Sequence, residues 1–123
     1  MAVESRSVIP MNSLILIMDS KSGQIPESTG GRGIAATSSC VAVGTREAND
    51  GPTELRMADI GEEIELPALN IHDGTLEVSS GELVASNIVG EPFLRWAVEG
   101  PSVRVQIYTN HSTEPDEVVV LVG

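Results

Sequence analysis

The sequence predicts an all-β protein: an antiparallel β-sandwich of about eight short strands, with a small β-barrel as the alternative. Branched apolar residues dominate its hydrophobic content, with 14 Val and 10 Ile against 9 Leu, and such side chains favour strands. The 12 glycines and 7 prolines are spread along the chain, so few windows are long enough for a helix. No segment repeats apolar residues at the i, i+3, i+4, i+7 spacing of an amphipathic helix.

The length of 123 residues matches one domain of ordinary size, and an apolar fraction of 41% is enough for a hydrophobic core. We expect a flexible N-terminal segment over residues 1–12. A single sandwich domain is expected over residues 13–123.

The first expected strand, Ser13 to Asp19, is apolar on both faces, which indicates a central position in its sheet. A connection rich in Gly, Ser and Pro follows. Strands are then predicted from Ile34 or Ser39 to Thr45 and from Thr53 to Asp59, separated by Asn49-Asp50-Gly51. Because these three residues tolerate positive φ, the two strands are predicted to pair as an antiparallel hairpin.

Apolar and acidic residues alternate from Glu63 to Ile71, which predicts a strand with a bulge or an edge at Pro67. His72-Asp73-Gly74 has the composition of a second hairpin turn and leads into a short strand, Thr75 to Val78. Four further strands are expected: Leu83 to Val89, Pro92 to Val98, Val103 to Thr109 and Glu117 to Val122.

The strand from Val103 to Thr109 alternates strictly, and its apolar residues are predicted to face the core. Its other face carries Arg104, Gln106 and Tyr108. A polar strand face with an aromatic anchor and a cation is a candidate contact surface, so these three residues are candidate binding residues.

The chain is strongly acidic, with 18 Asp and Glu against 7 Lys and Arg and a formal charge of −11. This composition disfavours nucleic-acid binding through a broad basic surface, because phosphate neutralisation needs clustered cations. An acidic field repels anionic membranes and steers basic partners toward the protein. Acidic residues crowd the stretch from Asp50 to Glu65, and we take Glu62, Glu63 and Glu65 as further candidate binding residues.

No arrangement typical of catalysis or of a metal site is apparent. Cys40 has only His72 and His111 as candidate bases and is expected to be a small buried core residue. The carboxylates and histidines lack zinc or calcium ligand spacing, so no metal and no cofactor is predicted. Gly30 to Gly33 is followed by an apparent strand instead of a helix, which favours a binding loop over a phosphate cradle.

One cysteine rules out an intramolecular disulfide, which fits a reducing compartment. The longest apolar run, Leu14 to Met18, is far too short to span a bilayer, and the N-terminal residues carry no apolar run typical of a signal peptide. We therefore expect a cytoplasmic protein.

The order of segments resembles that of one known family. It consists of an early strand before a Pro-containing loop, a hairpin, an alternating strand with an embedded proline, the unit Asp73-Gly74-Thr75-Leu76-Glu77-Val78, and a late V-x-V-x-I-Y-T strand from Val103. Small acidic β-sandwich proteins related to the competence nuclease inhibitor have a similar pattern. The resemblance runs from Ser13 to Val122 and implies a protein that associates with a nuclease, without assigning a role to any residue.

Three functions remain open. The first is a non-enzymatic protein-binding module, an inhibitor or immunity-type partner of a basic protein such as a nuclease. The second is a small-ligand-binding or metal-binding β-domain or an enzyme, using the acidic cluster or the Gly-rich loop. The third is a structural homo-oligomer in which the two apolar strands, Leu14 to Met18 and Val118 to Val122, pair across subunits.

Overall fold

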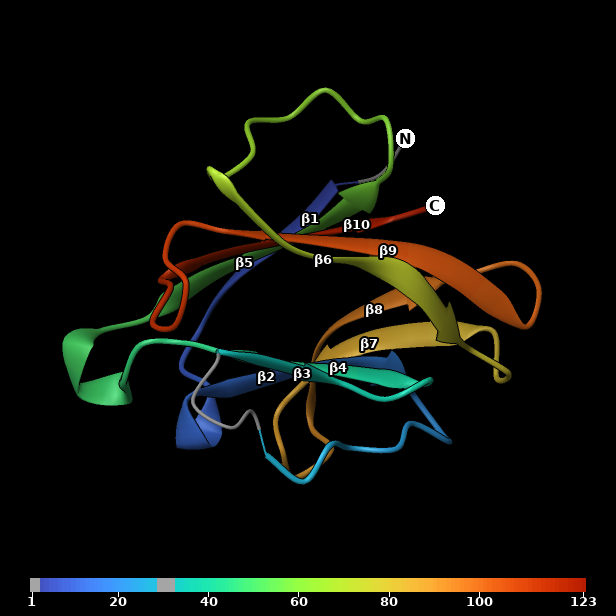
Figure 1. Ribbon diagram of the computed structural model, residues 1–123, viewed down its shortest axis with the longest axis horizontal. Helices are drawn as coiled ribbons and strands as arrows, with labels where there is room; N and C mark the ends of the chain where they lie inside the picture. Colours follow the sequence, from blue (N-terminus) through green and yellow to red (C-terminus); the bar gives the residue numbers. More distant parts are fainter. Residues whose placement is uncertain (1–2, 29–32) are drawn as a thin grey trace.

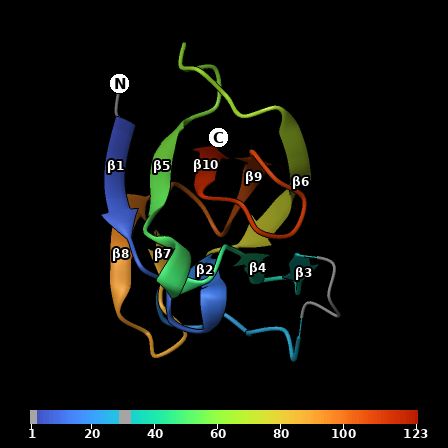
Figure 2. The same cartoon turned by 90° about the vertical axis from the view of Figure 1, so that its left-hand side faces the viewer.

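The computed structural model describes residues 3–28 and 33–123, and in that part of the chain ten strands form two five-stranded sheets. The two sheets lie face to face in separate layers (Figure 2). Sheet A has the order β1-β5-β10-β9-β6, and sheet B the order β3-β4-β2-β7-β8. The strands of sheet A are β1 (Val3–Val8), β5 (Thr53–Asp59), β6 (Leu69–Glu77), β9 (Ser102–Thr109) and β10 (Glu117–Val122). Those of sheet B are β2 (Leu14–Asp19), β3 (Ile34–Ala36), β4 (Cys40–Gly44), β7 (Glu82–Ser86) and β8 (Pro92–Ala97).

The predicted all-β sandwich is confirmed, with ten strands where about eight were expected. Its strand pairs are antiparallel except for β5 and β10, which run parallel at the centre of sheet A. The described residues contain no α-helix, only two 3₁₀ turns, η1 (Met11–Ser13) and η2 (Ala48–Asp50). None of the described helices is long and apolar enough to cross a membrane.

The N-terminal segment contains a strand that the sequence did not reveal. Residues 1–12 were expected to be flexible, yet β1 pairs antiparallel with β5 from Val3 to Val8. Only Val8 of this strand is buried, so the stretch lacks the apolar alternation that marks a strand in sequence. Backbone pairing to an already formed sheet places it at the edge.

The two most apolar strands, β2 and β10, lie at the centres of their sheets. β2 is hydrogen-bonded to β4 and β7, and β10 to β5 and β9. Both edges of each strand are therefore paired, and residues on both of its faces are buried, which explains the unbroken apolar runs. Neither strand has a free edge, so the expectation that these two strands pair across subunits is wrong.

Two predicted hairpin turns are also wrong. β4 and β5 belong to different sheets, and Asn49-Asp50-Gly51 forms part of the crossing between them around η2. His72-Asp73-Gly74 lies inside β6, which runs through to Glu77 with a register shift between Asn70 and His72. Turn-forming residues permit a change of direction but do not require one, and here cross-strand partners on β9 keep Asp73 and Gly74 in the ladder.

Connections cover the outer faces of both sheets (Figure 1). After β2 the chain passes over sheet B, where Gly23 lies so close to Met18 that a Cβ on Gly23 would be 2.7 Å from that of Met18. After β5, residues 60–68 cross sheet A. Under these connections lie apolar clusters distinct from the central core: one on sheet B around Leu16, Met18 and Cys40, and one on sheet A around Ala58, Val119 and Leu121.

Candidate functional site

The acidic residues taken as binding candidates lie on the connection of residues 60–68, above sheet A (Figure 1). The strand expected from Glu63 to Ile71 is wrong over its first half, since β6 begins only at Leu69. Ile64 packs down onto the apolar cluster of sheet A, while Glu63 and Glu65 are exposed. Leu66, which the alternation would place beside Ile64, is exposed, so the burial of this irregular segment does not follow the period of two in its sequence.

The segment is held to the sheet by backbone as well as side-chain contacts. Arg56 on β5 donates from Nη2 to the carbonyl oxygen of Glu65 at 3.0 Å. Ile60 and Ile64 contact the same apolar cluster as Tyr108 of β9. These contacts fix the path of the chain from both ends, so its three glutamates are presented by an anchored segment.

The second candidate group lies on the outer face of β9, as the alternation predicts. Val105 and Ile107 are fully buried in the central core, and Arg104, Gln106 and Tyr108 point the other way. Tyr108 joins the apolar cluster beneath residues 60–68, which brings the two candidate groups to one side of the molecule.

Arg104 is not a free cation. Its Nε and Nη2 donate to the two carboxylate oxygens of Asp73 at 3.0 and 2.9 Å, and Gln106 Nε2 donates to Asp73 Oδ2 at 3.2 Å. The hydrogen bonds from Arg104 and Gln106 lower the pKa of Asp73 to about 2, and the same contact raises the pKa of Arg104. Sequence reasoning placed Asp73 in a turn and missed this partnership.

Carboxylates outnumber cations on this side of sheet A, which we call the acidic face. Its two arginines are both in ion pairs, Arg56 with Glu117 at 3.9 Å and Arg104 with Asp73. The acidic face comprises six carboxylate residues on β5, β6, β10 and the connection: Glu54, Glu62, Glu63, Glu65, Asp73 and Glu117. The acidic face therefore carries a net negative charge. It also includes the apolar cluster of sheet A, which Ile60 and Ile64 partly cover.

Cys40 is a buried core residue, as predicted. Its thiol lies among Leu16, Met18 and other apolar side chains on the outer side of sheet B, and burial raises its pKa to about 12. His72, a candidate base for it, lies in the other sheet on β6, where burial lowers the imidazole pKa. A thiol kept protonated and away from a base does not have the environment of a nucleophile.

Among the described residues, His111, the other candidate base, shapes a turn, and no group of metal ligands is present. His111 accepts hydrogen bonds at Nδ1 from the backbone N–H groups of Thr113 and Glu114 and so shapes a turn. No group of three or more His, Cys, Asp or Glu residues in the described part of the chain could hold a metal ion. The Gly30 to Gly33 loop lies outside the described residues except for Gly33.

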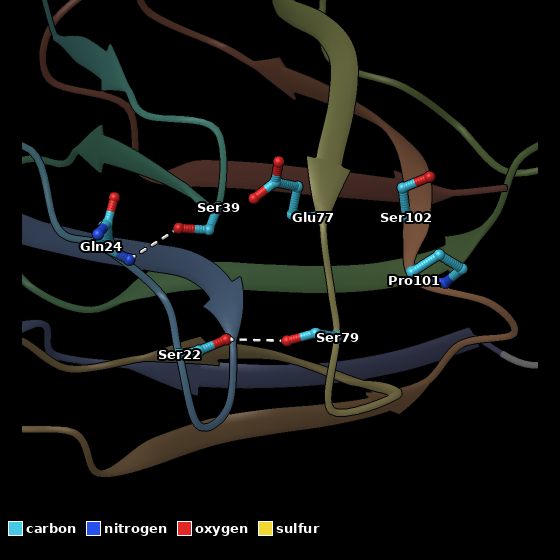
Figure 3. Close-up of a pocket in the computed structure, with 7 residues that line it drawn as sticks. All are labelled: Ser22, Gln24, Ser39, Glu77, Ser79, Pro101 and Ser102. Atoms are coloured by element: carbon cyan, nitrogen blue, oxygen red, sulfur yellow. Dashed lines mark hydrogen bonds between the residues drawn. The ribbon is translucent and has the colours of Figure 1, made fainter.

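An open pocket that sequence reasoning missed lies at the end of the sandwich where β2, β6 and β8 finish (Figure 3). Its volume is about 510 Å³, and seven residues line it: Ser22, Gln24, Ser39, Glu77, Ser79, Pro101 and Ser102. We call it the serine pocket. Three of the four serines come from three different connections and Ser102 is the first residue of β9, so their only sequence signal was the abundance of serine in and beside turns.

Comparison with known proteins shows the fold and no more. No protein-family model matches the chain, and no curated protein matches it. The crystal structure of ComJ from Bacillus subtilis, an inhibitor of the DNA-degrading activity of NucA, superposes with a TM-score of 0.70 at 8% identity, covering 97% of this chain and 93% of ComJ.

A second solved structure, described as crocagin biosynthetic gene J, superposes with a TM-score of 0.61 at 16% identity, covering 99% of this chain and 97% of that one. Both likenesses span nearly the whole chain. The expected resemblance to the competence nuclease inhibitor therefore holds at the level of the fold, and the sequences are too different to establish common family membership.

Proposed function

We propose that this protein acts by binding a basic protein through the acidic face, as an inhibitor or immunity-type partner, with a nuclease as the leading class of target. The observation that carries the proposal is a negative face whose two arginines are already neutralised by Glu117 and Asp73, leaving the glutamates of residues 62–65 without a described cation. The likeness to ComJ supports an inhibitory role.

The acidic face also offers apolar contact. Leu66, near the end of the connection, is 42% exposed although it is a large apolar side chain. Interfaces combine an apolar centre with a polar rim, and here an exposed leucine directly follows Glu65 on the same connection. The charges would set the rate of encounter, and Leu66 would contribute to the lifetime of the complex.

The proposal places the protein in a reducing compartment such as the cytoplasm, where its buried thiol stays reduced. In this proposal the protein acts by binding its partner and has no catalytic role. Self-association is a separate outcome that the same experiments detect.

The test begins with partner capture from the source cells and identification by mass spectrometry. Binding kinetics are then compared for the native protein and for Glu62→Gln/Glu63→Gln/Glu65→Gln. We expect the association rate to fall about three- to ten-fold and the dissociation rate to change less than about two-fold, because steering charges act before docking. The native association rate should also fall steeply with salt.

A matched control removes three exposed glutamates elsewhere: Glu4→Gln/Glu91→Gln/Glu99→Gln. It changes the net charge equally, so any larger effect of the first variant belongs to the acidic face. Equal kinetics for the two triple variants, or binding indifferent to salt, would show that the acidic composition serves solubility and would contradict the proposal.

A further inference from the structure

One hydroxyl of the serine pocket, that of Ser22, has its proton committed to a buried carboxylate, which also accepts from Ser80 outside the pocket lining. Asp19, 1% exposed at the end of β2, accepts hydrogen bonds from the backbone N–H and the hydroxyl of Ser22 at one oxygen, and from those of Ser80 at the other. An ionised carboxylate can only accept, so both hydroxyls must donate to it.

This orientation extends to the pocket wall. Ser22 Oγ lies 3.2 Å from Ser79 Oγ, and because the single proton of Ser22 points to Asp19, Ser79 must be the donor in this pair (Figure 3). Ser79 then has only lone pairs left for the pocket. The chain Ser79 to Ser22 to Asp19 turns this wall into a hydrogen-bond acceptor.

The opposite side of the pocket carries negative charge. Glu77 lies between Ser39 and Ser102 in Figure 3, and Ser38 Oγ donates weakly to its Oε2 at 3.5 Å. No Lys or Arg lines the pocket, and among the described residues neither Asp19 nor Glu77 takes part in an ion pair. The cavity therefore combines one oriented acceptor, Ser79 Oγ, with one carboxylate, Glu77, that has no ion-pair partner among the described residues, while Asp19 supports Ser22 without lining the cavity.

We propose that the serine pocket binds a guanidinium group, with Glu77 as the charge partner and Ser79 Oγ as an acceptor held in place by Ser22 and Asp19. A guanidinium carries five N–H donors in a plane and no acceptor, which complements a wall that has acceptors to offer. None of the residues that line the pocket belongs to the six carboxylates of the acidic face, so this inference does not depend on the proposed function.

The test is an amide chemical-shift titration of the native protein with methylguanidinium, with neutral N-methylurea as a control of nearly equal shape. We expect saturable shifts at Ser22, Gln24, Ser79 and Ser102 for methylguanidinium, and binding of methylurea weaker by about ten-fold or more. Equal binding of the two probes, or a stronger response to inorganic phosphate, would overturn the proposal without any variant.

Variants locate the site. Glu77→Gln should weaken the binding of methylguanidinium about five-fold, which is the scale of one exposed charge pair. Ser79→Ala should also weaken this binding. Glu91→Gln, an exposed glutamate in the β7–β8 connection, is the control and should leave the affinity unchanged. If Glu77→Gln behaves like the Glu91 control while its spectrum stays native, the assignment of Glu77 is wrong.

A final comparison separates the sources of the ligand. A blocked pentapeptide, Gly-Gly-Arg-Gly-Gly, is titrated beside the same peptide with citrulline in place of arginine. Binding of the arginine peptide as tight as that of methylguanidinium would show that an arginine of a polypeptide is the occupant. Binding of methylguanidinium alone would assign the pocket to a free small molecule.

Discussion

Asp19 connects two distant connections of the chain through a single carboxylate. Ser22 follows β2 and Ser80 follows β6, and each donates both its backbone N–H and its hydroxyl to Asp19. Burial alone would raise the pKa of Asp19, but the hydrogen bonds from Ser22 and Ser80 outweigh it and lower the pKa to about 2. The charged form is therefore the one that the folded protein stabilises.

This linkage predicts a loss of stability in acid. Because the folded pKa lies below the unfolded value of 3.8, the contribution of Asp19 is fully present above pH 4 and fades as the pH falls toward 2. Asp19→Asn should lower the free energy of unfolding at pH 7 by about 1–2 kcal/mol. The measurement is urea unfolding at pH 7, 4 and 3.

The difference in free energy of unfolding between the native protein and Asp19→Asn should become smaller as the pH falls. Asp59→Asn, an exposed residue of β5, serves as the control and should stay close to the native protein. If this difference in free energy of unfolding were constant from pH 7 to pH 3, the amide would destabilise the protein through altered packing. The charge of Asp19 would then make no contribution to stability.

At the scale of elements, the strands with a clear apolar pattern were predicted and the segments shaped by neighbours were not. β5 and β10 begin and end where expected, since alternation or an unbroken apolar run marks them. β1 has neither pattern and is held by its pairing with β5. Residues 60–68 alternate in sequence, yet Ile64 packs on sheet A while Leu66 is 42% exposed, so here periodicity alone predicted a strand that does not form.

The same segment yields a matched pair of substitutions. Ile64 packs on the apolar cluster of sheet A, whereas Leu66, two residues on, is 42% exposed. Ile64→Ala should lower the free energy of unfolding by about 1–2 kcal/mol, at the low end for a partly buried apolar side chain, and Leu66→Ala by less than about 0.5 kcal/mol. Chemical denaturation of both variants measures the difference.

The pair also links stability to binding. If the acidic face is the interface, Leu66→Ala should accelerate dissociation of the partner without a change in stability. Equal destabilisation by the two substitutions would show that residues 60–68 do not rest on the sheet through Ile64.

At the scale of the whole molecule, the two layers of the fold could be predicted from the sequence, but the pocket could not. A two-layer β-fold follows from composition and periodicity, because each strand must bury at least one face. The serine pocket depends on Ser22, Ser39 and Ser79 from three connections and on Ser102 at the start of β9, and these residues meet only once the topology is known. Likewise, Arg104 could be placed on an outer face from sequence, but its pairing with Asp73 required the register of β6 against β9.

The net charge of −11 is a property of the whole molecule and sets the final prediction. Self-repulsion destabilises a compact state, and salt screens it, with a Debye length near 10 Å at 0.1 M. Raising NaCl from 10 to 200 mM should therefore raise the melting temperature by about 2–5 °C.

A comparison with calcium distinguishes general screening of the negative charges from specific binding of the ion. Because the described residues hold no cluster of metal ligands, CaCl₂ at matched ionic strength should raise the melting temperature by no more than about 1–2 °C beyond NaCl, without saturation. Thermal melts in both salts, with a chelator control, make the measurement. A larger rise that saturates with calcium would mean that carboxylates of the folded protein converge on the ion, and the acidic face would then have to be considered as a metal site as well as a docking surface.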